Sequence, residues 1–390
     1  MKVIIGTDCL RTPLTGVGRY TYELCRALIA SEQIDNLEGF DFGRFHSMQE
    51  RLQQIAQQAC APEQQGQAAR GRTLRARLAE SRLATALFQA YATRVCGLLL
   101  QRKADAVFHS PNFHLPRYDG NSIVTVHDLS YLLYPDFHPA ARVDWMQRLV
   151  PEALERSKQV ICVSHSTRAA LLEHYAVAAD KVSVTHLGVD PVFRPRTAPE
   201  IAAQLKAYDL ESGEYLLCVS TLEPRKNIER LVRAYLRLDK RCRQRHPLVL
   251  AGELGWHYQE LQAAIADGAG QGVRHLGFVS QQALPALYSG ARCAIYPSLY
   301  EGFGLPVLEA QASGTPVIAS QSSSLPEVAS AQALLIDPYD TAALAGALQR
   351  VIDDRQWRED CSRAGLEKAA DFTWQRCAME TLAIYRKASR

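Results

Sequence analysis

The sequence predicts an α/β protein with two doubly wound parallel sheets, one in each half of the chain. Short apolar runs alternate with stretches whose apolar residues recur at helical spacing, which is typical of parallel sheets covered by helices. At 390 residues the chain is long enough for two domains with full cores. A polar connector with Pro191, Pro195 and Pro199 separates the two series of strands. We therefore expect domains over residues 1–195 and 196–372.

The composition argues against several classes of protein. The chain is 47% hydrophobic and 22% charged, as in ordinary globular proteins, and its net charge of +3 gives no signal for nucleic acid binding. Ten cysteines are scattered without a Cys-x-x-Cys pair, and no signal peptide precedes the apolar residues 3–5, so we expect free thiols in a reduced cytoplasmic compartment. No apolar run approaches the roughly 20 residues that span a bilayer, so any membrane contact is expected to be peripheral.

The first half opens with a strand expected over residues 3–8, a loop over 12–18 and a helix over 19–30. The loop contains Gly16 and Gly18 but no third glycine at the spacing of a dinucleotide-binding loop, so we discount a nicotinamide site. The two glycines either let the helix pack closely on the sheet or leave room for a substrate. The residues alone leave both interpretations open.

Residues 40–103 form a basic region of different character. Residues 53–67 are rich in glutamine and alanine, and residues 70–103 contain eight basic residues against one acidic residue, Glu80. Apolar residues near helical spacing predict one or two amphipathic helices: Leu74, Leu78, Leu87, Tyr91, Val95 and Leu98. These helices either pack on the sheet with solvated arginines outside or rest a basic face on anionic lipid.

Three apolar segments in the first half lead into polar residues: 106–108 into His109, 123–126 into His127 and Asp128, and 160–163 into Ser164. In open parallel sheets the carboxyl ends of the strands face the ligand crevice. His127 is the leading candidate for ligand contact, because Asp128 or another carboxylate could fix its tautomer. His109 and Ser164 are weaker candidates. Either Ser164 or Ser166 also suits the N-cap of the following helix, which would explain that serine without a ligand.

The most informative segment is Glu301-Gly302-Phe303-Gly304-Leu305-Pro306-Val307-Leu308-Glu309, which follows a short apolar run. Its glycines let the backbone approach a ligand, and a helix beginning at Pro306 would point free amides at an anion such as phosphate. Its two glutamates would face one crevice and accept hydrogen bonds from hydroxyl groups. The segment therefore predicts a site for a sugar nucleotide.

A second strand end in this half carries two cations. A strand over 215–219 is followed by Arg225 and Lys226 and by a helix expected over 228–240, with Asn227 as its N-cap. Two cations and a helix dipole would act on one anion there, which favours phosphate binding over a surface charge pair. Further strands and helices are expected at 248–253, 273–278, 294–296, 316–319, 334–336, 341–353, 355–370 and 373–387, the last capped by Thr373.

These segments resemble a known family. Residues 301–309 match the paired-glutamate motif of retaining glycosyltransferases with the GT-B fold, in glycosyltransferase family 4. Other family signatures are matched in the same order at 15–20, 126–128, 163–164, 187–190 and 223–227. The resemblance covers the chain except its arginine- and glutamine-rich region. It implies two Rossmann-like domains that face a central cleft, with a final helix over 373–390 crossing back to the N-terminal domain.

The resemblance also implies roles for four charged residues. Arg225 and Lys226 would bind the donor diphosphate, Glu309 the ribose hydroxyls, and Glu301 would lie at the transferred sugar. Negative charge grows on the diphosphate as the glycosidic bond breaks, and cations placed in advance would stabilise it by several kcal/mol.

Five further residues receive roles by resemblance. The amides around Phe303, Gly304 and Leu305 would help to hold the sugar and phosphate. His127 would contact the donor sugar near the reacting centre, and Gly16 would line the cleft near the diphosphate. No Asp-x-Asp triplet occurs in the chain, so we expect no metal and no cofactor. No residue clearly serves as a covalent nucleophile, which favours front-side attack assisted by the leaving phosphate.

The leading hypothesis is a hexosyltransferase that moves mannose or a related deoxyhexose from a nucleotide sugar, preferably GDP-linked, to a growing glycan. The acceptor is expected to be lipid-linked, as in lipopolysaccharide or exopolysaccharide biosynthesis, which would place the enzyme in the cytoplasm at the inner face of the membrane. A UDP-sugar donor, a nucleotide-sugar epimerase and a binding protein without catalysis are the alternatives.

Overall fold

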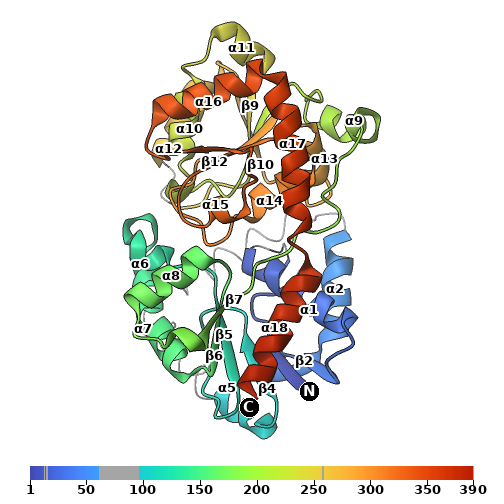
Figure 1. The fold of residues 1–390 in the computed structure, drawn as a ribbon, viewed down its shortest axis with the longest axis vertical. Helices are drawn as coiled ribbons and strands as arrows, with labels where there is room; N and C mark the ends of the chain where they lie inside the picture. Colours follow the sequence, from blue (N-terminus) through green and yellow to red (C-terminus); the bar gives the residue numbers. More distant parts are fainter. Residues whose placement is uncertain (13, 15, 61–95, 257–258, 390) are drawn as a thin grey trace.

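The computed structural model describes residues 1–12, 14, 16–60, 96–256 and 259–389. These residues form two sheets with helices on both faces of each (Figure 1). The strand orders are β3-β2-β1-β4-β5-β6-β7 in the first sheet and β10-β9-β8-β11-β12-β13 in the second. The alternation of strands and helices therefore predicted the α/β, doubly wound architecture correctly. No helix in the described part of the chain is both long and apolar enough to cross a membrane.

The first sheet is parallel apart from one edge hairpin. Its strands are β1 Lys2–Gly6, β2 Asn36–Asp41, β3 Arg44–Ser47, β4 Val107–Ser110, β5 Ser122–Val126, β6 Gln159–Cys162 and β7 Val182–Val184. β2 and β3 pair antiparallel through a turn in which Phe42 and Gly43 have positive φ. No strand was predicted there, because this partly exposed edge lacks the continuous apolar run of a central strand.

The α-helices among the described residues of the first half are α1 Gly16–Ala30, α2 Met48–Cys60, α5 Cys96–Leu100, α6 Ser130–Leu133, α7 Ala140–Arg156 and α8 His165–His174. α1 begins at Gly16, three residues before the expected start, so the predicted loop was too long. A Cβ on Gly18 would lie 2.7 Å from the Cys9 carbonyl oxygen, which makes Gly18 the glycine that permits close packing. A Cβ on Gly16 would meet no atom of the described chain within 4 Å.

The basic region of residues 40–103 is described only at its two ends. Residues 53–60 of its glutamine-rich part belong to α2, which buries Met48, Leu52 and Ile55. Of the predicted amphipathic pattern from Leu74 to Leu98, the part up to Val95 lies outside the described residues. Leu98 belongs to the short helix α5, where its side chain is exposed. The choice between sheet packing and lipid contact therefore stays open.

The second sheet is parallel throughout, with strands β8 Leu216–Val219, β9 Leu248–Ala251, β10 Val273–Gly277, β11 Cys293–Tyr296, β12 Val317–Ser320 and β13 Leu334–Ile336. Its helices are α9 Ala198–Ala207, α10 Ile228–Tyr235, α11 Lys240–Arg245, α12 Gln259–Ala269, α13 Leu284–Gly290, α14 Leu305–Ala312, α15 Leu325–Val328, α16 Thr341–Asp353 and α17 Arg355–Ala370. The helix expected over 228–240 ends at Tyr235, so the prediction was too long. A separate helix begins at Lys240, where Asp239 caps it.

The last helix, α18 Trp374–Ala388, packs beside α1 and against β5 and β6 of the first sheet (Figure 1). Thr373 caps it by accepting a hydrogen bond from the Arg376 amide, as predicted. The chain thus returns to the first sheet after completing the second. The residue bounds 1–195 and 196–372 for the two domains stay a prediction, and the two sheets lie on either side of that division.

Candidate active site

The loop between β11 and α14 ends in a helix N-terminus that offers free amides. α14 begins at Leu305, so Pro306 is its second residue rather than its first. Gly304 precedes the helix with φ of 114°, a conformation that favours glycine. Within the described chain, no group accepts a hydrogen bond from the amides of Phe303 and Gly304. These amides are therefore available to an anion.

The side chain of Phe303 belongs to the core rather than to the ligand surface. Its ring centroid lies 6.0 Å from that of His186 and 6.0 Å from that of Phe372. The Ser324 hydroxyl donates to the Phe303 carbonyl oxygen at 2.8 Å. These contacts fix the loop backbone on its core side. Phe303 therefore offers a ligand its main-chain amide and not its side chain.

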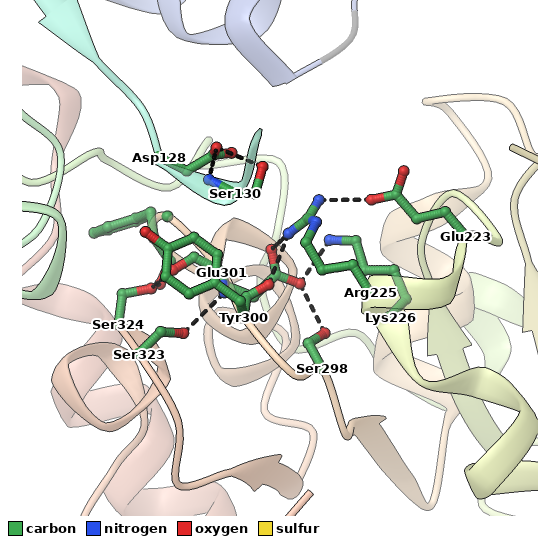
Figure 2. A network of polar contacts seen from close by, with 12 residues as sticks. Asp128, Ser130, Glu223, Arg225, Lys226, Ser298, Tyr300, Glu301, Ser323 and Ser324 are labelled. Atoms are coloured by element: carbon green, nitrogen blue, oxygen red, sulfur yellow. Dashed lines mark hydrogen bonds and ion pairs between the residues drawn. The ribbon is translucent and has the colours of Figure 1, made fainter. Parts of the chain in front are cut away.

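Glu301 is the centre of a polar network that joins the loop to the two predicted phosphate-binding cations (Figure 2). Its carboxylate accepts from Lys226 Nζ at 2.6 Å, from Ser298 Oγ at 2.7 Å and from Arg225 at 3.1 Å. Burial alone would raise the pKa of Glu301, but the neighbouring cations outweigh it and lower the pKa to about 2. Glu301 is therefore a carboxylate at every physiological pH.

Arg225 is held by two further groups. Its guanidinium donates to the Tyr300 carbonyl oxygen at 2.7 Å and to Glu223 at 2.6 Å. Burial lowers its pKa, whereas Glu301, Asp128 and Glu223 raise it by a larger amount, so Arg225 stays charged. The geometry thus brings Arg225, Lys226 and Glu301 together.

Asn227 does not cap α10, although it occupies the N-cap position. Its φ is 58°, and its amide group donates to the carbonyl oxygens of Pro297 and Pro338 at 3.0 and 2.7 Å. The predicted cap was wrong. Asn227 instead fastens the Arg225–Lys226 turn to the ends of β11 and β13, which positions the two cations.

His127 lies on the opposite side of the loop, at the end of β5. Its Nε2 donates to the Pro111 carbonyl oxygen at 2.8 Å, while Asp128 accepts from the Ser130 amide and hydroxyl at 2.9 and 2.7 Å. A carbonyl therefore fixes the tautomer, and the expectation of a carboxylate was wrong, because Asp128 turns toward the start of α6. Burial lowers the pKa of His127, so Nδ1 is a hydrogen-bond acceptor.

The main chains of the two domains touch at this point. A Cβ on Gly302 would lie 1.9 Å from the His127 carbonyl oxygen. The Thr167 hydroxyl on α8 donates to the Gly302 carbonyl oxygen at 3.2 Å, and the Tyr300 hydroxyl accepts from the Leu129 amide at 3.2 Å. The structure therefore brings His127 beside the loop of Glu301.

Glu309 also faces the N-terminal domain. Its carboxylate accepts from the Tyr288 hydroxyl at 3.1 Å and lies 3.4 Å from the guanidinium of Arg19 on α1. Arg19 in turn donates to Gln281 at 2.6 Å. Burial raises the pKa of Glu309, and Arg19 and Tyr288 only partly offset this. Gly16 begins the same helix, one turn before Arg19.

Two weaker candidates have structural partners. His109 is fully buried, with Nδ1 2.7 Å from the Tyr385 hydroxyl on α18 and Nε2 2.7 Å from the Thr125 hydroxyl. Ser164 caps α8 by accepting from the Thr167 amide at 3.0 Å, as predicted. The hydrogen bonds of His109 and Ser164 are therefore accounted for by the fold, without a ligand.

Comparison with known proteins identifies the family. Residues 14–193 match the model for "Glycosyltransferase Family 4", and residues 202–368 match "Glycosyl transferases group 1". The O-antigen chain mannosyltransferase B of Escherichia coli is 35% identical over 387 residues, which cover 99% of this chain and 100% of that protein. The chain belongs to glycosyltransferase family 4.

Two other matches place this glycosyltransferase among its relatives. The serotype-specific mannosyltransferase WbdA of E. coli is 30% identical over 265 residues, which cover 66% of this chain but only 32% of WbdA. The solved structure of sucrose-phosphate synthase from Thermosynechococcus elongatus has a TM-score of 0.72 at 22% identity and covers 99% of both chains. This last likeness shows the GT-B fold alone.

Four residues that shape the site of this glycosyltransferase received no individual role in the prediction from sequence. Ser298 and Glu223 bind Glu301 and Arg225. Ser323 Oγ accepts from the Glu301 amide at 2.8 Å, and Ser324 Oγ donates to the Glu301 carbonyl oxygen at 2.9 Å (Figure 2). Both serines follow β12, so the rule that ligand sites lie at carboxyl ends of strands would have found them.

Proposed function

We propose that the protein transfers mannose from GDP-mannose to a growing lipid-linked glycan of the O-antigen type, with retention of anomeric configuration. The observation that carries this proposal is full-length identity of 35% to a protein named O-antigen chain mannosyltransferase B. A lipid-linked acceptor would place the enzyme peripherally at the inner face of a membrane. The identity of the donor base, the lipid-linked acceptor and the retention of configuration are proposed here together with the mannosyl transfer.

The donor would lie between the two halves of the site. The diphosphate would be bound by Lys226, Arg225 and the free amides of Phe303 and Gly304 with that of Leu305, where a helix dipole adds to the positive potential. These groups are fixed before the reaction, so they stabilise the charge that grows on the leaving diphosphate without reorganising.

The sugar and ribose would be recognised by hydrogen-bond acceptors. His127 offers Nδ1 to a sugar hydroxyl, because its Nε2 proton is committed to the Pro111 carbonyl. Glu309 would accept from the ribose hydroxyls, with Gly16 leaving room at the start of α1. In this structure Arg19 is near Glu309, so ribose binding would replace or share that contact.

Retention would follow from front-side attack. Three hydrogen bonds engage both oxygens of the Glu301 carboxylate, and Asp128 turns toward Ser130 at the start of α6, so we propose that neither carboxylate acts as a covalent nucleophile. The departing phosphate would accept the proton of the acceptor hydroxyl as the new glycosidic bond forms. Arg225, Lys226 and the amides would supply the charge stabilisation, so we propose transfer without a metal or other cofactor.

A thermal-shift screen of nucleotide sugars tests the donor. A ligand that binds only the native state raises the free energy of unfolding, by about 2.7 kcal/mol at a ligand concentration of 100 times its Kd, and therefore raises Tm. We expect GDP-mannose and GDP to raise Tm more than UDP-glucose and UDP. A larger shift with UDP-sugars would overturn the GDP assignment while leaving a glycosyltransferase in place.

A further inference from the structure

We propose that His165, His186 and Glu327 form a binding site for a divalent transition metal, Zn²⁺ above all, that joins the two domains. His165 is the first residue of α8, and His186 follows β7. Glu327 lies on α15, which connects β12 to β13 of the second sheet. One ligand atom from each of the three lies within 4.8 Å of the others. This cluster is separate from Lys226, Arg225 and His127 and serves no part of the proposed transfer.

Glu327 already crosses from one domain to the other. Its two carboxylate oxygens accept from the amides of His165 and Ser166 at 2.8 and 2.7 Å, at the N-terminus of α8. The His186 Nε2 lies 3.2 Å from the same carboxylate. These hydrogen bonds outweigh burial and lower the pKa of Glu327, so the ligand is an ionised carboxylate. Its position is set before any metal arrives.

The two histidines are placed to complete the ligand set. Their ring centroids are 5.3 Å apart. The His165 side chain is exposed and makes no hydrogen bond to another described residue, so it can turn toward a metal at little cost. Zn–N and Zn–O bonds of about 2.0–2.1 Å in a tetrahedron separate ligand atoms by about 3.3 Å. His186 Nε2 and the Glu327 carboxylate, 3.2 Å apart, already have this spacing. His165, whose ligand atom lies within 4.8 Å of the other two, can reach it by a change of its side-chain rotamer.

The chemistry of the donors favours zinc over magnesium or calcium. Imidazole nitrogens suit Zn²⁺ and similar transition metals, whereas the two harder cations prefer oxygen ligands. Two histidines and one carboxylate are a known zinc set, with water in the fourth position. One carboxylate and two neutral imidazoles leave a bound Zn²⁺ with one net positive charge.

A metal bound by these three residues would hold the two domains together, and we call this effect the clamp. His186 packs against Phe372 at 5.5 Å and against Phe303 of the donor loop at 6.0 Å between ring centroids. Fixing His186 to Glu327 and His165 would oppose separation of the domains and so slow exchange of donor and product. Zinc would therefore inhibit transfer rather than support it, and this consequence alone rests on the proposed function.

Binding of Zn²⁺ to the full-length protein tests the site by calorimetry and thermal unfolding. We expect one zinc site in the wild type, a rise of Tm with Zn²⁺, and at least a tenfold weaker affinity in His165→Ala. His174→Ala, which removes an exposed histidine from the other end of α8, should bind zinc as the wild type does. Co²⁺ should give an absorption spectrum without a thiolate-to-metal band, which excludes cysteine ligands.

Transfer rates with and without Zn²⁺, compared within each variant, test the clamp. Zinc should slow the wild type and His174→Ala but not His165→Ala. Equal zinc affinity in the wild type and His165→Ala, or a thiolate band with Co²⁺, would overturn the site. Zinc binding without inhibition would overturn only the clamp. If the protein transfers no mannose, the calorimetry still tests the zinc site, because it does not depend on activity.

Discussion

The main chain of Gly302 lies directly against the carbonyl oxygen of His127, with 1.9 Å between that oxygen and the position of a Cβ on Gly302. The two residues come from different sheets, one after β11 and the other after β5. Glycine at 302 is therefore a condition for contact between the two halves of the site. Any side chain there must hold them apart.

Gly302→Ala is expected to slow transfer by about 10²-fold, because misplacement of catalytic groups by about 1 Å has effects of this size. Steady-state rates and thermal unfolding measure the two consequences separately. Each domain should still fold. In Gly346→Ala, at an exposed position of α16, the Cβ meets nothing within 4 Å, so this control should gain up to about 1 kcal/mol of stability and keep its activity. Wild-type turnover in Gly302→Ala would refute the contact's importance.

Lys226→Ala is expected to reduce kcat/KM by about 10²- to 10³-fold, the usual effect of deleting one preorganised donor to a developing negative charge. The fold should survive, because Glu301 keeps its bonds to Arg225 and Ser298. Circular dichroism and kinetics check both parts. Lys206→Ala, exposed on α9, is the matched control and should behave as the wild type. Near-normal turnover of Lys226→Ala would refute the phosphate assignment.

His109 makes the free energy of unfolding depend on pH. Burial, with a smaller effect of His127, lowers its pKa from 6.5 to about 3. Between these values the unfolded chain binds more protons than the folded one, so stability falls as the pH falls, by at most about 1.4 kcal/mol per pH unit.

Urea unfolding at pH 7, 6 and 5 tests this linkage. His109→Gln is less stable at neutral pH, since it disturbs the bonds to Tyr385 and Thr125, but it should lose stability less steeply on acidification. His174→Gln, on the surface, should keep the wild-type slope. An unchanged slope in His109→Gln would show that His109 is not the group responsible.

Transfer activity is expected to survive EDTA in full. The proposed charge stabilisation comes from Lys226, Arg225 and the amides before α14, none of which needs a metal. Initial rates before and after chelation, and after adding Mg²⁺, measure this directly. Loss of activity in EDTA with recovery in Mg²⁺ would contradict metal-independent transfer.

The sequence was sufficient for the buried parts of the fold. β11 and the first three residues of β12 are apolar, which is the composition expected of strands buried on both faces. The hairpin of β2 and β3 was missed because partly exposed edge strands carry polar residues that give no such pattern. The early start of α1 was missed because glycine in a first helical turn looks like a loop.

For the site, position was predictable but hydrogen-bond partners were not. His127, Arg225 and Glu301 follow strands, and strand ends meet at one edge of a sheet. Asn227 binds the carbonyl of Pro338, which is 111 residues away, and His127 binds a main-chain carbonyl instead of a carboxylate. Such choices depend on which backbone groups the fold leaves nearby, and no local pattern records that.

The most direct test is incubation of the protein with GDP-mannose and a mannose-terminated oligosaccharide on a hydrophobic tail, followed by mass spectrometry and NMR of the product. We predict GDP release and addition of one mannose with the α configuration of the donor. A β-linked product would contradict retention. Transfer only from UDP-sugars, or an epimerised nucleotide sugar formed without acceptor, would contradict the proposed function itself.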